Sequence, residues 1–117
     1  MKKGERLKNN NDFKKIYNKG KSYVHPLAVL YVLENSLGKN RVGFSVSKRL
    51  GNAVQRNRIK RILREVFRHK KDDLKIGYDF IMIARPRIKN ASYLQIDKAV
   101  LGLLNKAKLF EDKRRNS

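Results

Sequence analysis

The sequence predicts a single α+β domain, a sheet with helices packed on it, that spans residues 1–117. Two observations lead to this prediction. Apolar residues recur at helical spacing in three segments, whereas other segments alternate or run as short apolar stretches, as strands do. In addition, 117 residues are the length of one ordinary domain, and no repeat, Pro- or Ser-rich linker or change of composition divides the chain.

The first helix is expected from about Asn11 to Lys19. Asn10 or Asn11 can cap its start, and Gly20 is expected to end it. Its apolar face, at positions i, i+3 and i+4, consists of Phe13, Ile16 and Tyr17.

Three segments are expected to be strands, at residues 28–34, 41–47 and 78–84. The first is rich in β-branched and aromatic residues, and the second alternates strictly between apolar and small or polar side chains. A turn at 38–40 joins these two, and residues 21–34 can bend into more than one strand.

Two longer helices bracket the last strand, at about 52–70 and 92–108. Each carries a continuous apolar stripe, and the second opens with a capping box at 92–95. The expected order is therefore α-β-β(-β)-α-β-α. Residues 6–110 are expected to be ordered, and 111–117 to form a disordered tail.

The composition points to a polyanionic partner. Lys and Arg total 30 against 10 Asp and Glu, a formal net charge of +20, and self-repulsion of this size opposes a compact state unless a polyanion neutralises it. With no Cys, two isolated His and scattered carboxylates, the chain lacks the residues for a disulfide framework, a Cys-based zinc site, a His-centred triad or a two-metal site. No apolar run is long enough for a membrane span or a signal peptide, so we expect a cytoplasmic protein that does not bind membranes.

The positive charge is concentrated on the helix at 52–70. Residues 41–71 hold eleven basic residues and one acidic residue, Glu65. On a helical projection one polar sector, opposite the apolar stripe, is almost entirely cationic, which indicates a phosphate-binding face. Backbone N–H groups at 51–53 are expected to favour an anion as well, at the positive end of the helix dipole. The polar sector consists of Asn57, Lys60, Arg61, Arg64 and Arg68, and Lys48 and Arg49 extend the patch upstream.

Aromatic rings interleaved with cations suggest a second contact, with single-stranded nucleic acid. Phe13 and Tyr17 share a helix face, Tyr31 belongs to the first β segment, and lysines surround them. These rings can equally be ordinary core residues. The small side chains of Gly43, Ser45 and Ser47 can likewise leave room for a ligand on the sheet or simply form an exposed sheet face.

The segment at 41–61 reads RVGFSVSKRLGNAVQRNRIKR and closely resembles the signature of the bacterial ribonuclease P protein subunit. Arg56, Asn57 and Arg58 lie within the basic motif of that family. The similarity extends over roughly residues 6 to 108. One departure is Tyr17, where many relatives have Phe, so that a hydroxyl is added to the ring.

This resemblance implies a fold and a function. The fold is a two-layer α/β sandwich like the second domain of ribosomal protein S5, with a left-handed β-α-β crossover through the basic helix. The partners are a large catalytic RNA and precursor tRNA, from which the complex removes the 5′ leader. The RNA carries the active site and its Mg²⁺, so this chain alone is expected to be non-catalytic. The resemblance assigns no metal site or cofactor to the chain itself, and no obligate protein partner is inferred.

The resemblance also implies two groups of site residues. The leader cleft, between the first helix and the sheet, corresponds to Phe13, Tyr17, Val29, Tyr31 and Ser45. The motif that faces the catalytic RNA corresponds to Lys48, Arg49, Asn52, Arg56, Asn57, Arg58, Lys60, Arg61, Arg64 and Arg68.

Two other classes of protein remain as alternatives. A small structural ribosomal protein would be equally basic, but would spread its cations over several faces and lack an aromatic cleft. An autonomous protein nuclease would need catalytic carboxylates or histidines, of which the chain has few.

Overall fold

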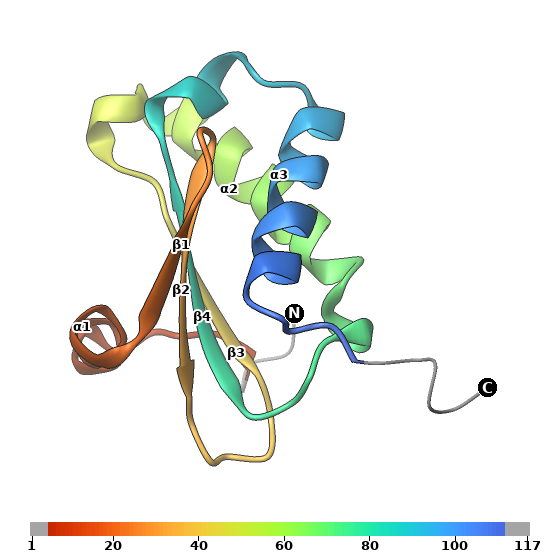
Figure 1. Cartoon of the computed structure of the whole chain (residues 1–117). Helices are drawn as coiled ribbons and strands as arrows, with labels where there is room; N and C mark the ends of the chain where they lie inside the picture. Colours follow the sequence, from red (N-terminus) through yellow and green to blue (C-terminus); the bar gives the residue numbers. More distant parts are fainter. Residues whose placement is uncertain (1–4, 112–117) are drawn as a thin grey trace.

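The computed structural model describes residues 5–111, which form a four-stranded sheet with helices on both faces (Figure 1). The predicted α+β class and element order are confirmed, and residues 21–34 do form two strands. The helices are α1 (Asn10–Lys19), α2 (Ala53–Arg68) and α3 (Tyr93–Lys106), and the strands are β1 (Lys21–Val24), β2 (Ala28–Glu34), β3 (Arg41–Ser45) and β4 (Tyr78–Ala84). Short 3-10 turns are η2 (Lys48–Leu50), η3 (Lys71–Asp73) and η4 (Pro86–Asn90).

α1 begins one residue earlier than predicted. Asn9 is its cap, because the Asn9 side chain accepts a hydrogen bond from the Asn11 N–H at 2.8 Å. The predicted caps, Asn10 and Asn11, were wrong because three successive asparagines can all cap a helix and the pattern does not choose among them. Gly20 ends the helix as expected, and a Cβ there would lie 2.5 Å from the backbone oxygen of Ile16.

β3 is two residues shorter than the predicted strand at 41–47. It ends at Ser45, and the Ser47 side chain instead accepts a hydrogen bond from the Arg49 N–H at 3.2 Å and caps η2. The competing interaction is local, since serine bonds to nearby backbone as readily as it fits a strand.

α3 opens with the predicted capping box, in which Ser92 accepts from the Gln95 N–H at 3.1 Å. Of the predicted disordered tail, Glu111 is described, and its N–H donates to the Asp73 carbonyl at 2.9 Å. The rest of that prediction, residues 112–117, lies outside the described residues. Within 5–111, no helix has the length and apolar character needed to cross a membrane.

The strand order across the sheet is β1-β2-β4-β3. β1 pairs with β2 and β2 with β4 in antiparallel fashion, whereas β3 and β4 are parallel. The chain therefore passes from β3 through α2 to the adjacent parallel strand β4, which is the predicted β-α-β connection. The left-handed sense of this crossover stays a prediction. β3 lies at one edge of the sheet, and Arg6 forms a bridge to Val42 on its outer side.

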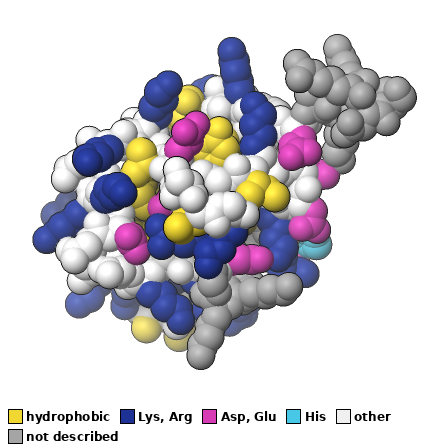
Figure 2. Space-filling view, turned by 90° about the horizontal axis from the view of Figure 1, so that it is seen from below, with side chains coloured by type: hydrophobic (Ala, Val, Ile, Leu, Met, Phe, Trp, Pro, Cys, Tyr) yellow, Lys and Arg dark blue, Asp and Glu magenta, His cyan; other side chains and the backbone are white. Residues whose placement is uncertain are grey.

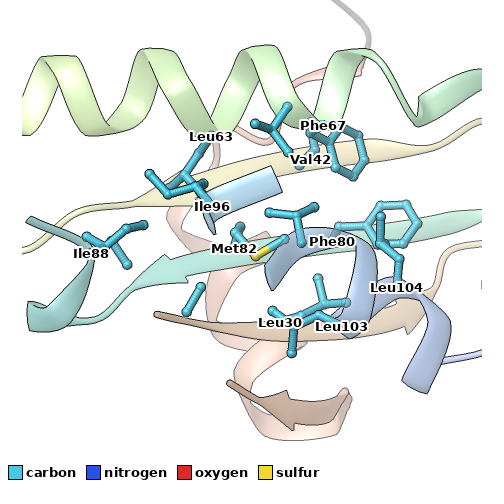
Figure 3. Packing of buried hydrophobic residues seen from close by; sticks show 14 of the residues in the cluster. Leu30, Val42, Leu63, Phe67, Phe80, Met82, Ile88, Ile96, Leu103 and Leu104 are labelled. Carbon is cyan, nitrogen blue, oxygen red and sulfur yellow. The ribbon is translucent and has the colours of Figure 1, made fainter. Parts of the chain in front are cut away.

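The main core lies between the sheet and the pair α2 and α3 (Figure 3). Alternate strand residues point toward these helices, because successive side chains of a strand project to opposite faces of the sheet. The strands contribute Leu30, Val42, Phe80 and Met82, and the helices contribute Leu63, Phe67, Ile96, Leu103 and Leu104, all almost inaccessible to solvent.

A second, smaller cluster lies on the opposite face, beneath α1. Its buried members are Leu7, Ile16 and Ile81, and it is completed by the partly buried Phe13, Tyr31, Leu33 and Ile83. The sheet is therefore covered on one side by two long helices and on the other by one short helix, which leaves part of that side accessible.

Candidate nucleic-acid interface

α2 begins with a capping box that the sequence analysis did not predict. The Asn52 side chain accepts from the Gln55 N–H at 2.9 Å, and the Gln55 side chain accepts from the Asn52 N–H at 2.9 Å. The Asn-x-x-Gln pattern was the signal, since it is the box of α3 with Asn in place of Ser.

The capping box changes the expectation for the backbone at 51–53. The Asn52 N–H is bonded to Gln55, and the Gly51 N–H donates to the Lys48 carbonyl at 3.4 Å. We expected these groups to be open to an anion, and for both of them that expectation was wrong. Of the three N–H groups expected at 51–53, those of Gly51 and Asn52 are therefore already bonded within the protein.

The two faces of α2 differ as predicted. Ile59, Leu63, Val66 and Phe67 are buried in the main core. The motif residues lie on the accessible part of the helix: Asn57, Arg58, Arg61 and Arg68 are exposed, and Lys60 and Arg64 are half-buried. The burial of one face therefore fixes the direction in which the cations project.

Glu65 is the one acidic residue of α2, and it contacts two side chains near the helix end. It accepts from Arg68 Nη2 at 2.7 Å and lies 3.0 Å from His69 Nε2. The hydrogen bond from Arg68 holds the pKa of Glu65 below its usual value. Among residues 5–111, no other cation of α2 has a carboxylate within ion-pair distance. The cations in the first three turns of α2 are therefore not neutralised by a neighbouring carboxylate of the described residues.

The remaining motif cations surround the turn that precedes α2. Lys48 and Arg49 are exposed in η2. Arg56 is half-buried, and its Nε donates to the Gly51 carbonyl at 3.2 Å, so this side chain folds back over the turn. Cationic residues thus extend from the segment after β3 into α2.

The predicted aromatic residues meet on the other side of the sheet, beside α1. The ring centroids of Phe13 and Tyr17 are 6.3 Å apart, and Tyr17 stands edge-on to Tyr31 at 5.1 Å. The Ser45 side chain lies beside the Tyr17 hydroxyl. Burial raises the pKa of Tyr17, and the neighbouring Ser45 hydroxyl opposes that shift. The structure therefore brings together four of the five residues that the resemblance assigns to the leader cleft.

The three rings differ in how much they contribute to packing. Tyr17 is 38% exposed, whereas Phe13 and Tyr31 are half-buried against the small cluster. Phe13 also covers Gly43, where a Cβ would lie 2.5 Å from Phe13 Cζ. The room that we expected above Gly43 is therefore filled by the protein itself, and Tyr17 is the ring most available to a ligand.

One row of side chains across this face is partly open to solvent. In register across the sheet lie Val24 of β1, Val29 of β2, Ile83 of β4 and Ser45 of β3. Val24 is 54% exposed, and the other three are half-buried. This open row, together with Tyr17 and Tyr31, forms what we call the aromatic face, and it includes Val29, the fifth residue assigned to the leader cleft.

β3 lies between the aromatic face and the cations of α2. Its Ser45 side chain belongs to the aromatic face, whereas Phe44 packs toward α2. A hollow of about 150 Å³ on this strand is lined by Gly43, Phe44, Lys60 and Arg64, among others. The two groups of predicted site residues are therefore neighbours across a single edge strand.

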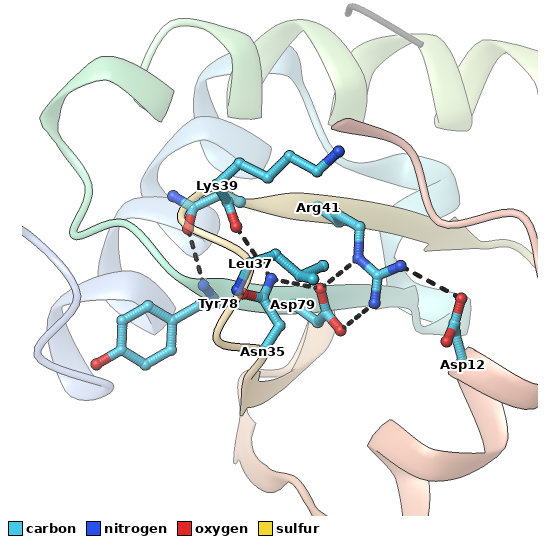
Figure 4. A network of polar contacts seen from close by, with 8 residues as sticks. Asp12, Asn35, Leu37, Lys39, Arg41, Tyr78 and Asp79 are labelled. Atoms are coloured by element: carbon cyan, nitrogen blue, oxygen red, sulfur yellow. Dashed lines mark hydrogen bonds and ion pairs between the residues drawn. The ribbon is translucent and has the colours of Figure 1, made fainter. Parts of the chain in front are cut away.

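Sequence reasoning missed the polar residues that tie α1 to the sheet (Figure 4). Arg41 donates to both oxygens of Asp79, at 2.8 and 2.7 Å, and its third nitrogen lies 3.3 Å from Asp12 of α1. Asn35 adds a bond to Asp79 at 2.9 Å. The signal was present, because Arg41 and Asp79 each lie near the start of an otherwise largely apolar strand, but only the register of β3 and β4 places them side by side.

A metal site in a protein needs several ligating side chains close together. Within the described part of the chain, no three His, Asp or Glu residues gather closely enough to hold a metal ion.

The family model described as Ribonuclease P matches residues 1–108 of this chain. The chain belongs to the ribonuclease P protein family. It is 47% identical over 109 residues to the ribonuclease P protein component of Alkaliphilus oremlandii, covering 93% of this chain and 96% of that protein. It is 41% identical over 109 residues to the component from Alkaliphilus metalliredigens, covering 93% of this chain and 98% of that one.

Solved structures of the family have the same fold. A Staphylococcus aureus RNase P protein mutant with defective mRNA degradation activity superposes with a TM-score of 0.87 at 43% identity, covering 92% of each chain. The RNase P protein from Thermotoga maritima superposes with a TM-score of 0.80 at 30% identity, covering 87% of this chain and 96% of that one. As a ribonuclease P protein component, the chain is part of an endoribonuclease holoenzyme that acts in tRNA processing, and it associates with the ribonuclease P RNA.

Proposed function

We propose that this chain binds the catalytic RNA through the cations of α2 and η2, and holds the 5′ leader of precursor tRNA on the aromatic face. Both contacts together promote removal of the leader, in the cytoplasm. The observation that carries the proposal is their position on the two sides of β3. A single RNA strand lying on the aromatic face would reach Lys48 and Arg49, which follow just after the end of β3.

The aromatic face suits an unpaired strand. Tyr17 offers a partly exposed ring, and the open row of Val29, Ile83 and Ser45 offers a half-buried, mostly apolar surface on which a base can lie. Stacking of bases on aromatic rings tolerates any sequence, because every base has a π-face. Exposed lysines on α1, at 14, 15 and 19, are available to the phosphates.

The cationic face of α2 suits a folded RNA. Its guanidinium groups can bind phosphate oxygens in pairs, and most have no carboxylate partner among the described residues. Each phosphate that such a group neutralises releases a counterion, which makes binding strong at low salt and largely independent of base sequence.

In this proposal the RNA supplies the active site and the Mg²⁺ ions, and the protein supplies binding and orientation. The side chains of the two faces are cations, aromatic rings, small polar groups and apolar groups. They can hold phosphates and bases, but among the described residues of these faces none is placed with a partner that would make it a general base or a nucleophile.

Reconstitution tests this function. The protein is combined with the cognate catalytic RNA at low Mg²⁺, and cleavage of precursor tRNA is measured against RNA alone and protein alone. We expect cleavage only in the combined sample. Cleavage by the protein alone, or equal rates with and without it, would contradict the proposal.

A further inference from the structure

A buried carboxylate lies on the α1 side of the sheet. Asp79 is 4% exposed and is the one charged residue within 5–111 that is buried. Arg41 lies directly opposite it in the β3–β4 register and donates from Nε and Nη2 to its two oxygens. A buried carboxylate needs a partner of this kind, because an unpaired charge in the interior is costly. The guanidinium of Arg41 is therefore held in one orientation.

The remaining nitrogen of the same guanidinium reaches α1. Arg41 Nη1 lies 3.3 Å from Asp12, in the first turn of the helix. Asp79 and Asp12 together raise the pKa of Arg41, with the bond to Asp79 as the larger cause. Arg41 thus connects the sheet to a helix that has few other anchors.

Besides the packing of Phe13 on Gly43, two contacts one turn apart hold one face of α1 against the sheet. Asp12 and Ile16 are four residues apart and so share a helix face, with Asp12 bonded to Arg41 and Ile16 buried in the small cluster. Phe13 and Tyr17 each follow one residue later and share the adjacent face. Two anchors on one face determine the rotation of the helix about its axis, and that rotation sets where both rings stand over the sheet.

The apolar cluster beneath α1 is small. Of the described residues only Leu7, Ile16 and Ile81 are buried in it, and a helix of ten residues has little stability of its own. Rings that must stay accessible to bases cannot also be buried completely. The ion pair between Arg41 and Asp12 can fix the orientation of α1 while the rings stay accessible.

We propose that Arg41 is a positioning residue for leader binding: fixed by Asp79, it holds Asp12 and so places Phe13 and Tyr17 for contact with the leader. This inference rests on the proposed function of the aromatic face. It predicts that the bond between Arg41 and Asp12 matters for precursor tRNA more than for the stability of the fold.

The experiment uses Asp12→Asn with Asp97→Asn as its matched control. Both carboxylates are 32% exposed and both pair with a cation, but Asp97 pairs with Lys70 between α2 and α3, on the other side of the sheet. Each variant is assembled with the catalytic RNA, and dissociation constants are measured for precursor and for mature tRNA, which has no leader. A thermal melt of each free variant checks folding.

For Asp12→Asn we expect the preference for precursor over mature tRNA to fall about fivefold, the size of effect of one partly exposed ion pair. Asp97→Asn should leave the preference unchanged, and Asp12→Glu should restore it, since a longer carboxylate still reaches Arg41. In a Tyr17→Ala background, Asp12→Asn should have little further effect, because both changes act on the same interaction with the leader.

An unchanged preference in Asp12→Asn, or an equal loss in Asp97→Asn, would overturn the role of Arg41 while leaving the aromatic face in place. Additive losses from Asp12→Asn and Tyr17→Ala would overturn it as well. If Tyr17→Ala and Phe13→Ala themselves keep the full preference for precursor tRNA, the proposed binding of the leader fails, and the inference fails with it.

Discussion

Gly43 determines how deeply Phe13 lies on the sheet. A Cβ at this position would lie 2.5 Å from Phe13 Cζ and 3.3 Å from Leu7 Cβ. The absence of a side chain in the middle of β3 is therefore what allows an aromatic ring of α1 to rest on the strand. This packing is specific to one glycine and one ring.

The substitution Gly43→Ala should displace Phe13 without removing any ring. We expect a loss of about 1–3 kcal/mol in the free energy of unfolding, as is usual for overpacking, and weaker binding of precursor tRNA. Gly102→Ala in α3 is the control, since a Cβ there meets nothing within 4 Å. Denaturant unfolding and a binding titration measure the two effects; full affinity for precursor tRNA in Gly43→Ala would show that the position of Phe13 is unimportant.

At the scale of elements, two exposed asparagines near the start of α2 differ in whether they cap the helix. Asn52 caps the helix, whereas Asn57 is exposed on its cationic face. Both belong to the motif expected to face the RNA, but the side-chain bond that holds the start of the helix comes from Asn52.

Replacing Asn52 by Ala should therefore lower the free energy of unfolding by about 1 kcal/mol, the usual cost of removing an N-cap. Replacing Asn57 by Ala should change it by less than about 0.5 kcal/mol, as for most surface sites. Urea unfolding of the two variants provides the comparison. Equal stability of both would mean that the capping box contributes nothing.

If the cationic face of α2 binds RNA, the affinity for RNA should depend on salt through these residues. The double variant Arg61→Ala, Arg64→Ala should bind the catalytic RNA more weakly and with a flatter salt dependence, by about 0.7–0.9 in the log–log slope for each phosphate that is no longer neutralised. The control is Lys98→Ala, Lys108→Ala, which removes the same charge from exposed positions in and after α3. Identical slopes for the two double variants would show that RNA binding depends only on the net charge of the protein, and not on whether the cations lie on α2.

At the scale of the whole molecule, positive charge is not confined to α2. On the face seen in Figure 2, Lys and Arg side chains are spread over the surface with single acidic side chains among them. α2 differs because its cations are crowded on one face with Glu65 as the one acidic residue of the helix. The position of the charge, and the scarcity of carboxylates beside it, therefore distinguish α2, the helix that we propose as the RNA-binding element.

The fold was largely predictable because its signals are local. The patterns of β2, β4 and α3 are unambiguous, and strands at 28–34 and 78–84 were predicted with their observed ends. The errors arose where several residues could make the same local hydrogen bond. The three asparagines at 9–11, each able to cap the start of α1, are an example. The tie from Arg41 to Asp79 and Asp12 could not be predicted, since it depends on the pairing of residues that lie 38 positions apart in the chain.

For the candidate site, the sequence predicted which aromatic residues lie together, but not how much of each ring is exposed. Phe13, Tyr17 and Tyr31 could be core or ligand-binding residues from the pattern alone. The structure distinguishes them by exposure: Phe13 and Tyr31 support the small cluster, and Tyr17 is the least buried. Exposure of this kind depends on how α1 lies on the sheet, which no local pattern encodes.

Tyr17→Ala provides the most direct test of leader binding on the aromatic face. Dissociation constants of the reconstituted holoenzyme are measured for precursor and mature tRNA. Removal of one stacking platform, about 1–3 kcal/mol per base, should weaken binding of precursor tRNA by about tenfold and leave mature tRNA and assembly with the RNA unchanged. Equal losses of affinity for both tRNAs, together with a large fall in melting temperature, would mean that Tyr17 is a packing residue and that the leader lies elsewhere.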